Sequence, residues 1–165
     1  MKSLHVVLHQ PEIPQNTGSI ARTCAAIGAK LHLIKPLGFS TENRYLKRAG
    51  LDYWHLVDVI YQNSIEELFN QYPDGSFSFL TKMASQSYDK IHCNGDIFLI
   101  FGSETKGLPS PLLAQNKDRC FRIPMVREAR SLNLSNAVAV VVYEVLRHHE
   151  FLGLEISGDK VGSKN

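Results

Sequence analysis

Short apolar segments alternate with polar loops along most of the 165-residue chain. Several of these segments are rich in β-branched or aromatic residues, as strands are. The pattern predicts strands at Leu4–Leu8, Lys30–Ile34, His55–Tyr61, Phe77–Thr81, Asp96–Phe101 and Cys120–Pro124. The fifth is apolar at almost every position, as expected of a central strand in a parallel sheet.

Between the strands, apolar residues recur at helical spacing. The first helix is predicted over Gly18–Ile27, with Asn16 or Thr17 as its cap and Gly28 at its end. Ser64 and Glu67 have the spacing of a capping box and predict the start of another helix. The remaining helices are predicted at Tyr45–Ala49, Pro111–Gln115 and Ser135–Phe151.

Strands that alternate with helices predict an α/β fold. We expect a single domain over residues 1–152, built on a mostly parallel six-stranded sheet flanked by helices. Residues 153–165 are rich in glycine, serine and lysine, and we expect a flexible C-terminal tail there.

Composition limits the function only loosely. The net charge of +2 is weakly basic, so local clusters of cations indicate more than the total does. The three cysteines, Cys24, Cys93 and Cys120, have no zinc-site spacing, and we interpret them as reduced and structural. The N-terminus is too short and polar for a signal peptide, and no apolar run has the length of a membrane span. We therefore expect a cytoplasmic protein.

Several common site motifs are absent from the sequence. It contains no GxGxxG after the first strand and no GxxxxGK[ST], which disfavours dinucleotide-binding and P-loop proteins. It contains no GxSxG, which disfavours a serine hydrolase of that type. The seven histidines are scattered, and we expect no metal site.

Three polar loops follow predicted strands, at residues 9–18, 102–109 and 124–135. Ligands of open α/β sheets bind outside the C-terminal strand ends, so we expect these loops to converge there. Each of these loops, taken alone, is weak evidence for a binding site. Gly102–Gly107 is also compatible with an ordinary turn, and Arg22 with a solvated helical arginine.

Three segments together resemble a known family. They are Pro11–Arg22 (PEIPQNTGSIAR), Phe101–Pro109 (FGSETKGLP) and Arg122–Glu144, which contains RSLNLSNAVAVVVYE. They resemble the three motifs of the SPOUT methyltransferases of the SpoU/TrmH type, which methylate ribose 2′-hydroxyls of RNA. The resemblance covers roughly residues 4–152. Within the family, the resemblance is greatest to members that act on the wobble nucleotide of tRNA. The segment Lys47–Tyr53 (KRAGLDY) also resembles these members.

The resemblance implies S-adenosyl-L-methionine as cofactor, tRNA as substrate, a C-terminal trefoil knot and a homodimer with the active site near its interface. The methylated nucleotide would be a cytidine or a carboxymethylaminomethyluridine. The implied cofactor-binding residues are Leu80, Thr81, Gly102, Glu104, Ile123, Met125, Ser131 and Leu132.

Arg22 corresponds to the arginine proposed to act at the 2′-hydroxyl. A guanidinium is a poor base, so holding a phosphate or stabilising a developing alkoxide is an equally open role. The other implied catalytic residues are Asn16, Asn133, Ser135 and Tyr143, of which the tyrosine is equally compatible with a core position.

Phosphate contacts are expected from Lys47, Arg48, Arg127 and Arg130, although cations of this kind also occur on plain solvated faces. Two alternatives stay open. One is a 2′-O-methyltransferase of another RNA, such as ribosomal RNA, and the other is a non-enzymatic RNA-binding protein of the same fold.

Overall fold

The computed structural model describes residues 1–40, 54–92 and 94–158. Its strands are β1 (Ser3–His9), β2 (Lys30–Ile34), β3 (Val59–Gln62), β4 (Ser76–Leu80), β5 (Gln86–Ser87), β6 (Asp96–Phe101) and β7 (Cys120–Arg122). Its helices are α1 (Pro14–Ile27), α3 (Ile65–Gln71), α4 (Ser110–Gln115) and α5 (Leu134–His148), with short 3-10 helices η1 (Tyr88–Lys90) and η2 (Lys117–Arg119).

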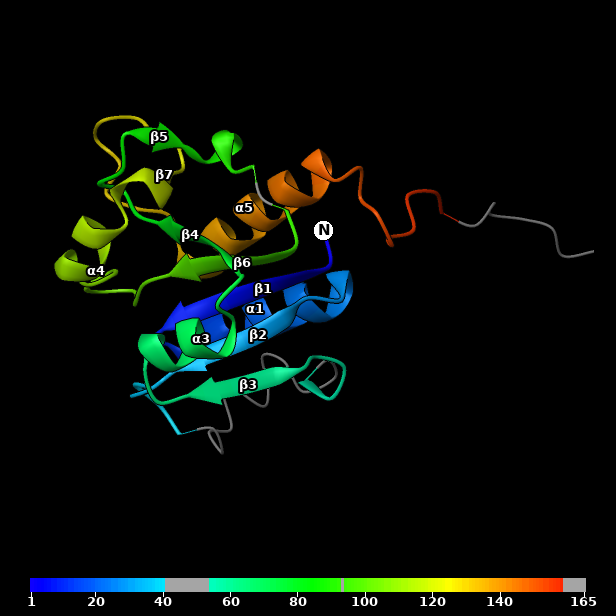
Figure 1. Cartoon of the computed structure of the whole chain (residues 1–165), viewed down its shortest axis with the longest axis horizontal. Coiled ribbons are helices and arrows are strands. Elements are labelled where there is room, and N and C mark those ends of the chain that lie inside the picture. Colours follow the sequence, from blue (N-terminus) through cyan, green and yellow to red (C-terminus); the bar gives the residue numbers. More distant parts are fainter. Residues whose placement is uncertain (41–53, 93, 159–165) are drawn as a thin grey trace, which may run out of the picture.

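One parallel sheet organises the fold, with strand order β3-β2-β1-β6-β4-β7-β5 (Figure 1). The α/β prediction is confirmed, but the sheet has seven strands where six were expected. The additional strand, β5, has two polar residues and pairs with β7 at the edge, Gln86 opposite Phe121. A strand this short and polar has no periodic pattern to reveal it.

Helices cover both faces of the sheet (Figure 1). The helices α1 and α5 pack on one face, in a core that includes Ile20, Val138 and Leu99. On the other face, α3 and α4 pack over Phe98 and Ile100 of β6. The central strands β1 and β6 are therefore buried on both sides, in agreement with their apolar sequences.

The start of α1 differs from the prediction. The helix begins at Pro14, and its N-cap, Ile13, makes no side-chain capping bond. Asn16 and Thr17, predicted as caps, are buried inside the helix. Proline is favoured in the first turn because its fixed φ suits the helix and its missing N–H is not needed there. Gly28 ends the helix as predicted, with a φ of 67°.

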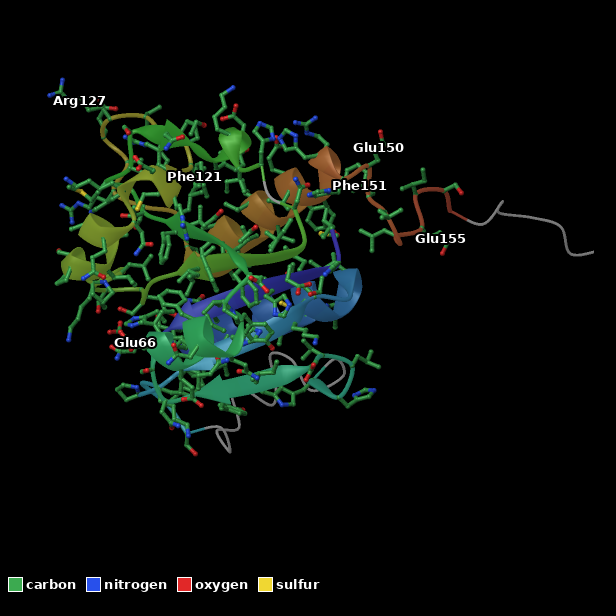
Figure 2. All side chains as sticks on the ribbon, in the orientation of Figure 1. Glu66, Phe121, Arg127, Glu150, Phe151 and Glu155 are labelled. Carbon is green, nitrogen blue, oxygen red and sulfur yellow. The ribbon has the colours of Figure 1, made fainter. Side chains whose placement is uncertain are left out.

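Three further boundaries were wrong by two residues or more, and one of them is the end of β7, which is Arg122 rather than Pro124. The predicted strand from His55 begins only at Val59, because it pairs with β2, which itself begins at Lys30. Helix α5 ends at His148 rather than Phe151, since Glu150 and Phe151 have left-handed backbone angles (Figure 2). The Ser64 cap is confirmed: its hydroxyl accepts a bond from the Glu67 N–H.

The remaining predictions have different outcomes. Cys24 and Cys120 are unpaired and buried, and burial raises the pKa of Cys24 to about 12, as expected of structural thiols. Cys93 and the predicted helix Tyr45–Ala49 lie outside the described residues. The knot and the domain boundary at residue 152 stay predictions. Among the helices that the structure describes, none has the length and apolar content of a membrane span.

Candidate active site

A cavity of about 460 Å³ lies at the C-terminal ends of β4, β6 and β7. Four separate segments line it. They are residues 13 and 16 at the start of α1, residues 80–82 after β4, residues 101–107 after β6, and the segment from Phe121 to Ala137 in part. The three polar loops therefore converge at the predicted sheet edge, and a fourth loop joins them.

The loop Gly102–Gly107 forms a tight wall of this cavity. Ser103 and Gly107 form a β-bridge, and the Ser103 hydroxyl accepts a bond from the Lys106 N–H (3.3 Å). A Cβ at Gly102 would lie 2.1 Å from the carbonyl carbon of Gly107. Only glycine fits at position 102, because the backbone of residues 107 and 108 occupies the space that a side chain would need.

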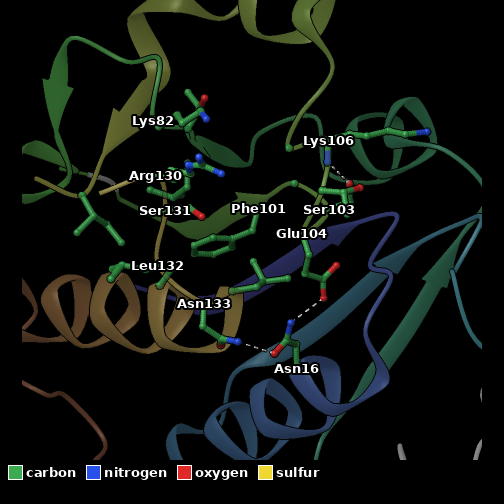
Figure 3. A pocket seen from close by; sticks show the side chains of 18 of the residues that line it. Asn16, Lys82, Phe101, Ser103, Glu104, Lys106, Arg130, Ser131, Leu132 and Asn133 are labelled. Carbon is green, nitrogen blue, oxygen red and sulfur yellow. Dashed lines mark hydrogen bonds between the residues drawn. The ribbon is translucent and has the colours of Figure 1, made fainter. Parts of the chain in front are cut away.

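A chain of polar bonds connects three of the lining segments (Figure 3). The Asn16 amide donates to Glu104 Oε1 (2.9 Å), and Asn16 Oδ1 accepts from the Asn133 amide (3.0 Å). Asn133 Oδ1 in turn accepts from the N–H and the hydroxyl of Ser135 (2.9 and 2.6 Å). The two asparagine side chains thus use both their amide N–H and their carbonyl oxygen to hold the segments together.

Apolar side chains form the remaining wall, from Leu80, Phe101, Phe121, Ile123, Met125 and Leu132. Leu132 is 41% exposed although it borders the cavity, so it presents apolar surface toward solvent. Apolar walls with a few polar groups are typical of sites for cofactor-sized molecules. S-adenosylmethionine fits this chemistry, because its adenine needs apolar faces and nearby backbone groups.

Three cations border the same cavity: Lys82, Lys106 and Arg130 (Figure 3). None of them forms an ion pair within residues 1–40, 54–92 and 94–158. The cavity edge is therefore suited to anionic ligands such as phosphates. No group of three or more His, Cys, Asp or Glu side chains in these ranges is placed to hold a metal ion.

All eight residues predicted to bind the cofactor line the cavity, and so do Asn16, Asn133 and Arg130. Ser135 does not line the cavity, but its hydroxyl donates a hydrogen bond to Asn133, which does. Arg22 and Tyr143 do not line it. Both are exposed, on α1 and α5, and Tyr143 is 48% accessible. Arg127 lies at the outer tip of the loop before α5 (Figure 2). Lys47 and Arg48 lie outside the described residues.

Other lining residues were not predicted, among them Ile13, Lys82, Phe101, Ser103, Thr105, Lys106 and Phe121. Lys82 follows directly on a strand end, so the rule that indicated the other loops also applied to it. Phe101 ends β6 and Phe121 lies in the middle of β7, and neither was predicted as a site residue.

Comparison with known proteins agrees with this geometry. Residues 3–143 match the family model described as the SpoU rRNA Methylase family. The chain belongs to that family. A Bacillus subtilis (strain 168) protein, provisionally named tRNA (cytidine(34)-2′-O)-methyltransferase, is 56% identical over 93% of this chain and 98% of its own. A Yersinia pestis protein named tRNA (cytidine(34)-2′-O)-methyltransferase is 43% identical over 91% of this chain and 96% of its own.

Solved structures in the family have the same fold. A Bacillus anthracis protein described as a candidate RNA methyltransferase superposes with a TM-score of 0.87, at 50% identity over 94% of this chain and 100% of its own. A structure described as giving insights into 2′-OH methylation of C/U34 on tRNA has a TM-score of 0.85, at 42% identity over 91% and 98% of the two chains. An rRNA methyltransferase from Sinorhizobium meliloti with bound S-adenosylmethionine has a TM-score of 0.77, at 26% identity over 88% and 56%.

Proposed function

We propose that this protein is an S-adenosylmethionine-dependent methyltransferase that modifies the ribose 2′-hydroxyl of the wobble nucleotide of tRNA. That nucleotide is a cytidine or a carboxymethylaminomethyluridine. The observation that carries the proposal is the convergence of the three family motifs on one cavity, in a chain similar over its length to proteins named for this activity.

The chain's own groups divide the work of the reaction. S-adenosylmethionine, when bound, supplies an electrophilic methyl group on a sulfonium. The apolar wall would hold the adenine, and backbone groups of the loops that contain Gly102 and Leu132 would bind its polar edge. Asn133 and Ser135 fix the geometry at the start of α5, and there they would help to orient the substrate ribose or Arg22.

Arg22 acts on the substrate rather than on the cofactor. It lies outside the cavity of its own chain, exposed on α1. Its guanidinium holds a phosphate or stabilises the charge that develops on the 2′-oxygen. Proton removal from the hydroxyl by this group is a further role for it, although its high pKa makes a guanidinium a poor base.

The active enzyme is a homodimer in this proposal. Helices α1 and α5 pack against one another, and α5 exposes Val140 (39%) and Tyr143 (48%). These exposed side chains on α5 are suited to contact with a second copy, which would bring one subunit's α1 and α5 near the other's cavity. Sedimentation at micromolar concentration tests this, and a monomer at that concentration would contradict it.

The test of the activity incubates purified protein with cofactor and unmodified tRNA and then maps the methylated riboses. We expect one methylated position, the wobble nucleotide. Methylation of ribosomal RNA instead would favour the alternative substrate, which the family's rRNA members make reasonable. A protein that binds RNA but shows no calorimetric titration with S-adenosylmethionine would favour the non-enzymatic alternative.

Substitution of Arg22 separates substrate chemistry from cofactor binding. Arg22→Ala is expected to abolish turnover and leave the affinity for S-adenosylmethionine almost unchanged, since the residue does not line the cavity. The matched control is Arg119→Ala, an exposed arginine just before β7, at the opposite strand end. Full activity in Arg22→Ala would show that this role is wrong.

The cellular compartment proposed for the reaction is the cytoplasm.

A further inference from the structure

We propose that Glu12 is a positioning residue that fixes the Gly102–Gly107 wall against the start of α1 and thereby sets the affinity for the cofactor. The second half of this statement rests on the proposed function. Glu12 does not itself line the cavity, whereas all six residues of the loop do. It therefore acts through its partner in that loop, Thr105.

Two carboxylates link these segments reciprocally. The Glu12 carboxylate accepts from Thr105, whose hydroxyl lies 2.8 and 2.7 Å from its two oxygens and whose N–H lies 3.2 Å from Oε2. In the other direction, Glu104 Oε2 accepts from the Glu12 N–H (2.8 Å) and Oε1 from the Ile13 N–H (3.2 Å). Each carboxylate thus binds the backbone of the segment that carries the other.

Reciprocal bonds of this kind define an orientation as well as a distance. With a single contact, the loop is free to rotate about that contact. Contacts from neighbouring residues on both sides remove the rotation, as in a capping box at a helix start. Bonds to an ionised carboxylate are also about twice as strong as those between neutral groups.

The backbone at Pro11 and Glu12 also contacts the segment after β2. The Gly38 N–H donates to the Pro11 carbonyl (2.9 Å). A Cβ at Gly38 would lie 2.8 Å from the Cα of Glu12, so the two backbones are in direct contact. The Glu12 backbone is therefore held between Gly38 and Glu104, and its side chain is directed at Thr105.

The Glu12 side chain adds a second attachment to the one that Glu104 makes to residues 12, 13 and 16, and the loop's remaining hydrogen bonds are internal. The bridge between Ser103 and Gly107 and the bond from the Lys106 N–H close the turn on itself. They give the loop a fixed shape but do not place it relative to α1. Loss of the Glu12 bonds should leave the turn intact and allow the wall to shift, which widens the cavity that binds the cofactor.

The experiment compares Glu12→Ala, Thr105→Val and Thr105→Ser in the full chain. Hydrogen–deuterium exchange of residues 102–108 reports the position of the wall without any ligand. Calorimetry gives the dissociation constant of S-adenosylmethionine, and kinetics separate its KM from kcat. The control is Glu155→Gln, an exposed carboxylate in the C-terminal segment.

We expect Glu12→Ala and Thr105→Val to speed exchange in residues 102–108 but not in α3. The dissociation constant and KM for the cofactor should rise about tenfold, as for the loss of one good hydrogen bond. At saturating cofactor, kcat should change little. Thr105→Ser keeps the hydroxyl and should restore wild-type values, and combining Glu12→Ala with Thr105→Val should add almost nothing to either single change.

Unchanged exchange in the loop would overturn the proposal, and so would a lower melting temperature with unaltered cofactor affinity. Equal defects in Thr105→Ser and Thr105→Val would also overturn it. Failure of the wild-type protein to bind S-adenosylmethionine would refute the proposed function instead. In that case the exchange data alone still decide whether Glu12 positions the loop.

Discussion

Gly102 shows how closely one residue can limit the shape of a site. It follows directly on β6, and its missing side chain allows Gly107 and Leu108 to pack against it. Gly107 has a φ of 69°, which glycine adopts without strain. One glycine at each end of the loop thus allows the tight turn, while the residues between the two glycines carry the polar groups of the wall.

We expect Gly102→Ala to open this turn, because its Cβ would lie 2.3 Å from the Leu108 nitrogen. The free energy of unfolding in urea should fall by about 1–3 kcal/mol, the usual cost of overpacking. Affinity for S-adenosylmethionine should fall with it. Gly158→Ala, where nothing lies within 4 Å of the added Cβ, is the control. Wild-type stability and affinity in Gly102→Ala would contradict the packing argument.

At the scale of elements, β1 and β2 carry a buried histidine pair on the sheet face that α3 covers. His5 Nδ1 and His32 Nε2 are 2.7 Å apart, and both residues are about 1% exposed or less. Tyr72 and Phe98 pack against both rings. Burial, and for His5 also the charge of its neighbour His32, lowers the pKa of both histidines from 6.5 to about 4.

This pair should make stability fall in mild acid. The unfolded chain takes up protons near pH 6.5, whereas the folded chain resists them until about pH 4. The contribution is complete above pH 6.5 and is lost as the pH falls toward 4, on the order of 3 kcal/mol for each histidine. Nearby Asp96, Asp58 and Lys30 modify the two titrations.

Urea unfolding between pH 4 and pH 8 measures this loss. The double variant His5→Gln with His32→Gln cannot titrate, and its stability should depend less on pH across this window. His55→Gln, at an exposed position, should retain the wild-type curve. If the double variant also retains it, the pair is not responsible for the acid sensitivity.

Local patterns predicted the elements better than their ends. Apolar runs such as Asp96–Phe101 located buried strands, because burial on both faces requires apolar residues throughout. The start of β3 depends instead on where its partner β2 begins, which is a property of the pairing. The first helix was predicted only from Gly18, although proline is favoured at a helix start and α1 begins at Pro14.

In the candidate site, too, local patterns predicted some features, whereas others depend on contacts between distant segments. The three loops were located from strand ends and from a family resemblance, and they do meet at one cavity. The bond between Glu12 and Thr105 joins residues 93 positions apart, and no local pattern indicates it. Contacts of this kind follow from the three-dimensional fold alone, so the residues that hold the site together were harder to predict than those that line it.

For the whole molecule, the placement of charge matters more than its total of +2. Lys82, Lys106 and Arg130 come from three different loops and border the same cavity. If they neutralise RNA phosphates there, binding releases counterions and weakens as salt rises. Each contact contributes about 0.7–0.9 to the slope of log affinity against log salt concentration.

Titrations of tRNA at several salt concentrations therefore count these contacts. Lys82→Gln, Lys106→Gln and Arg130→Gln should each reduce the steepness of the slope by about one phosphate contact. Lys2→Gln, an exposed cation at the start of the chain near the opposite end of β1, should leave it unchanged. The affinity for S-adenosylmethionine is measured in parallel, because these side chains border the cofactor cavity and a change in it would separate damage to the cavity from loss of a phosphate contact. Identical slopes in all four variants would place the RNA backbone elsewhere on the molecule.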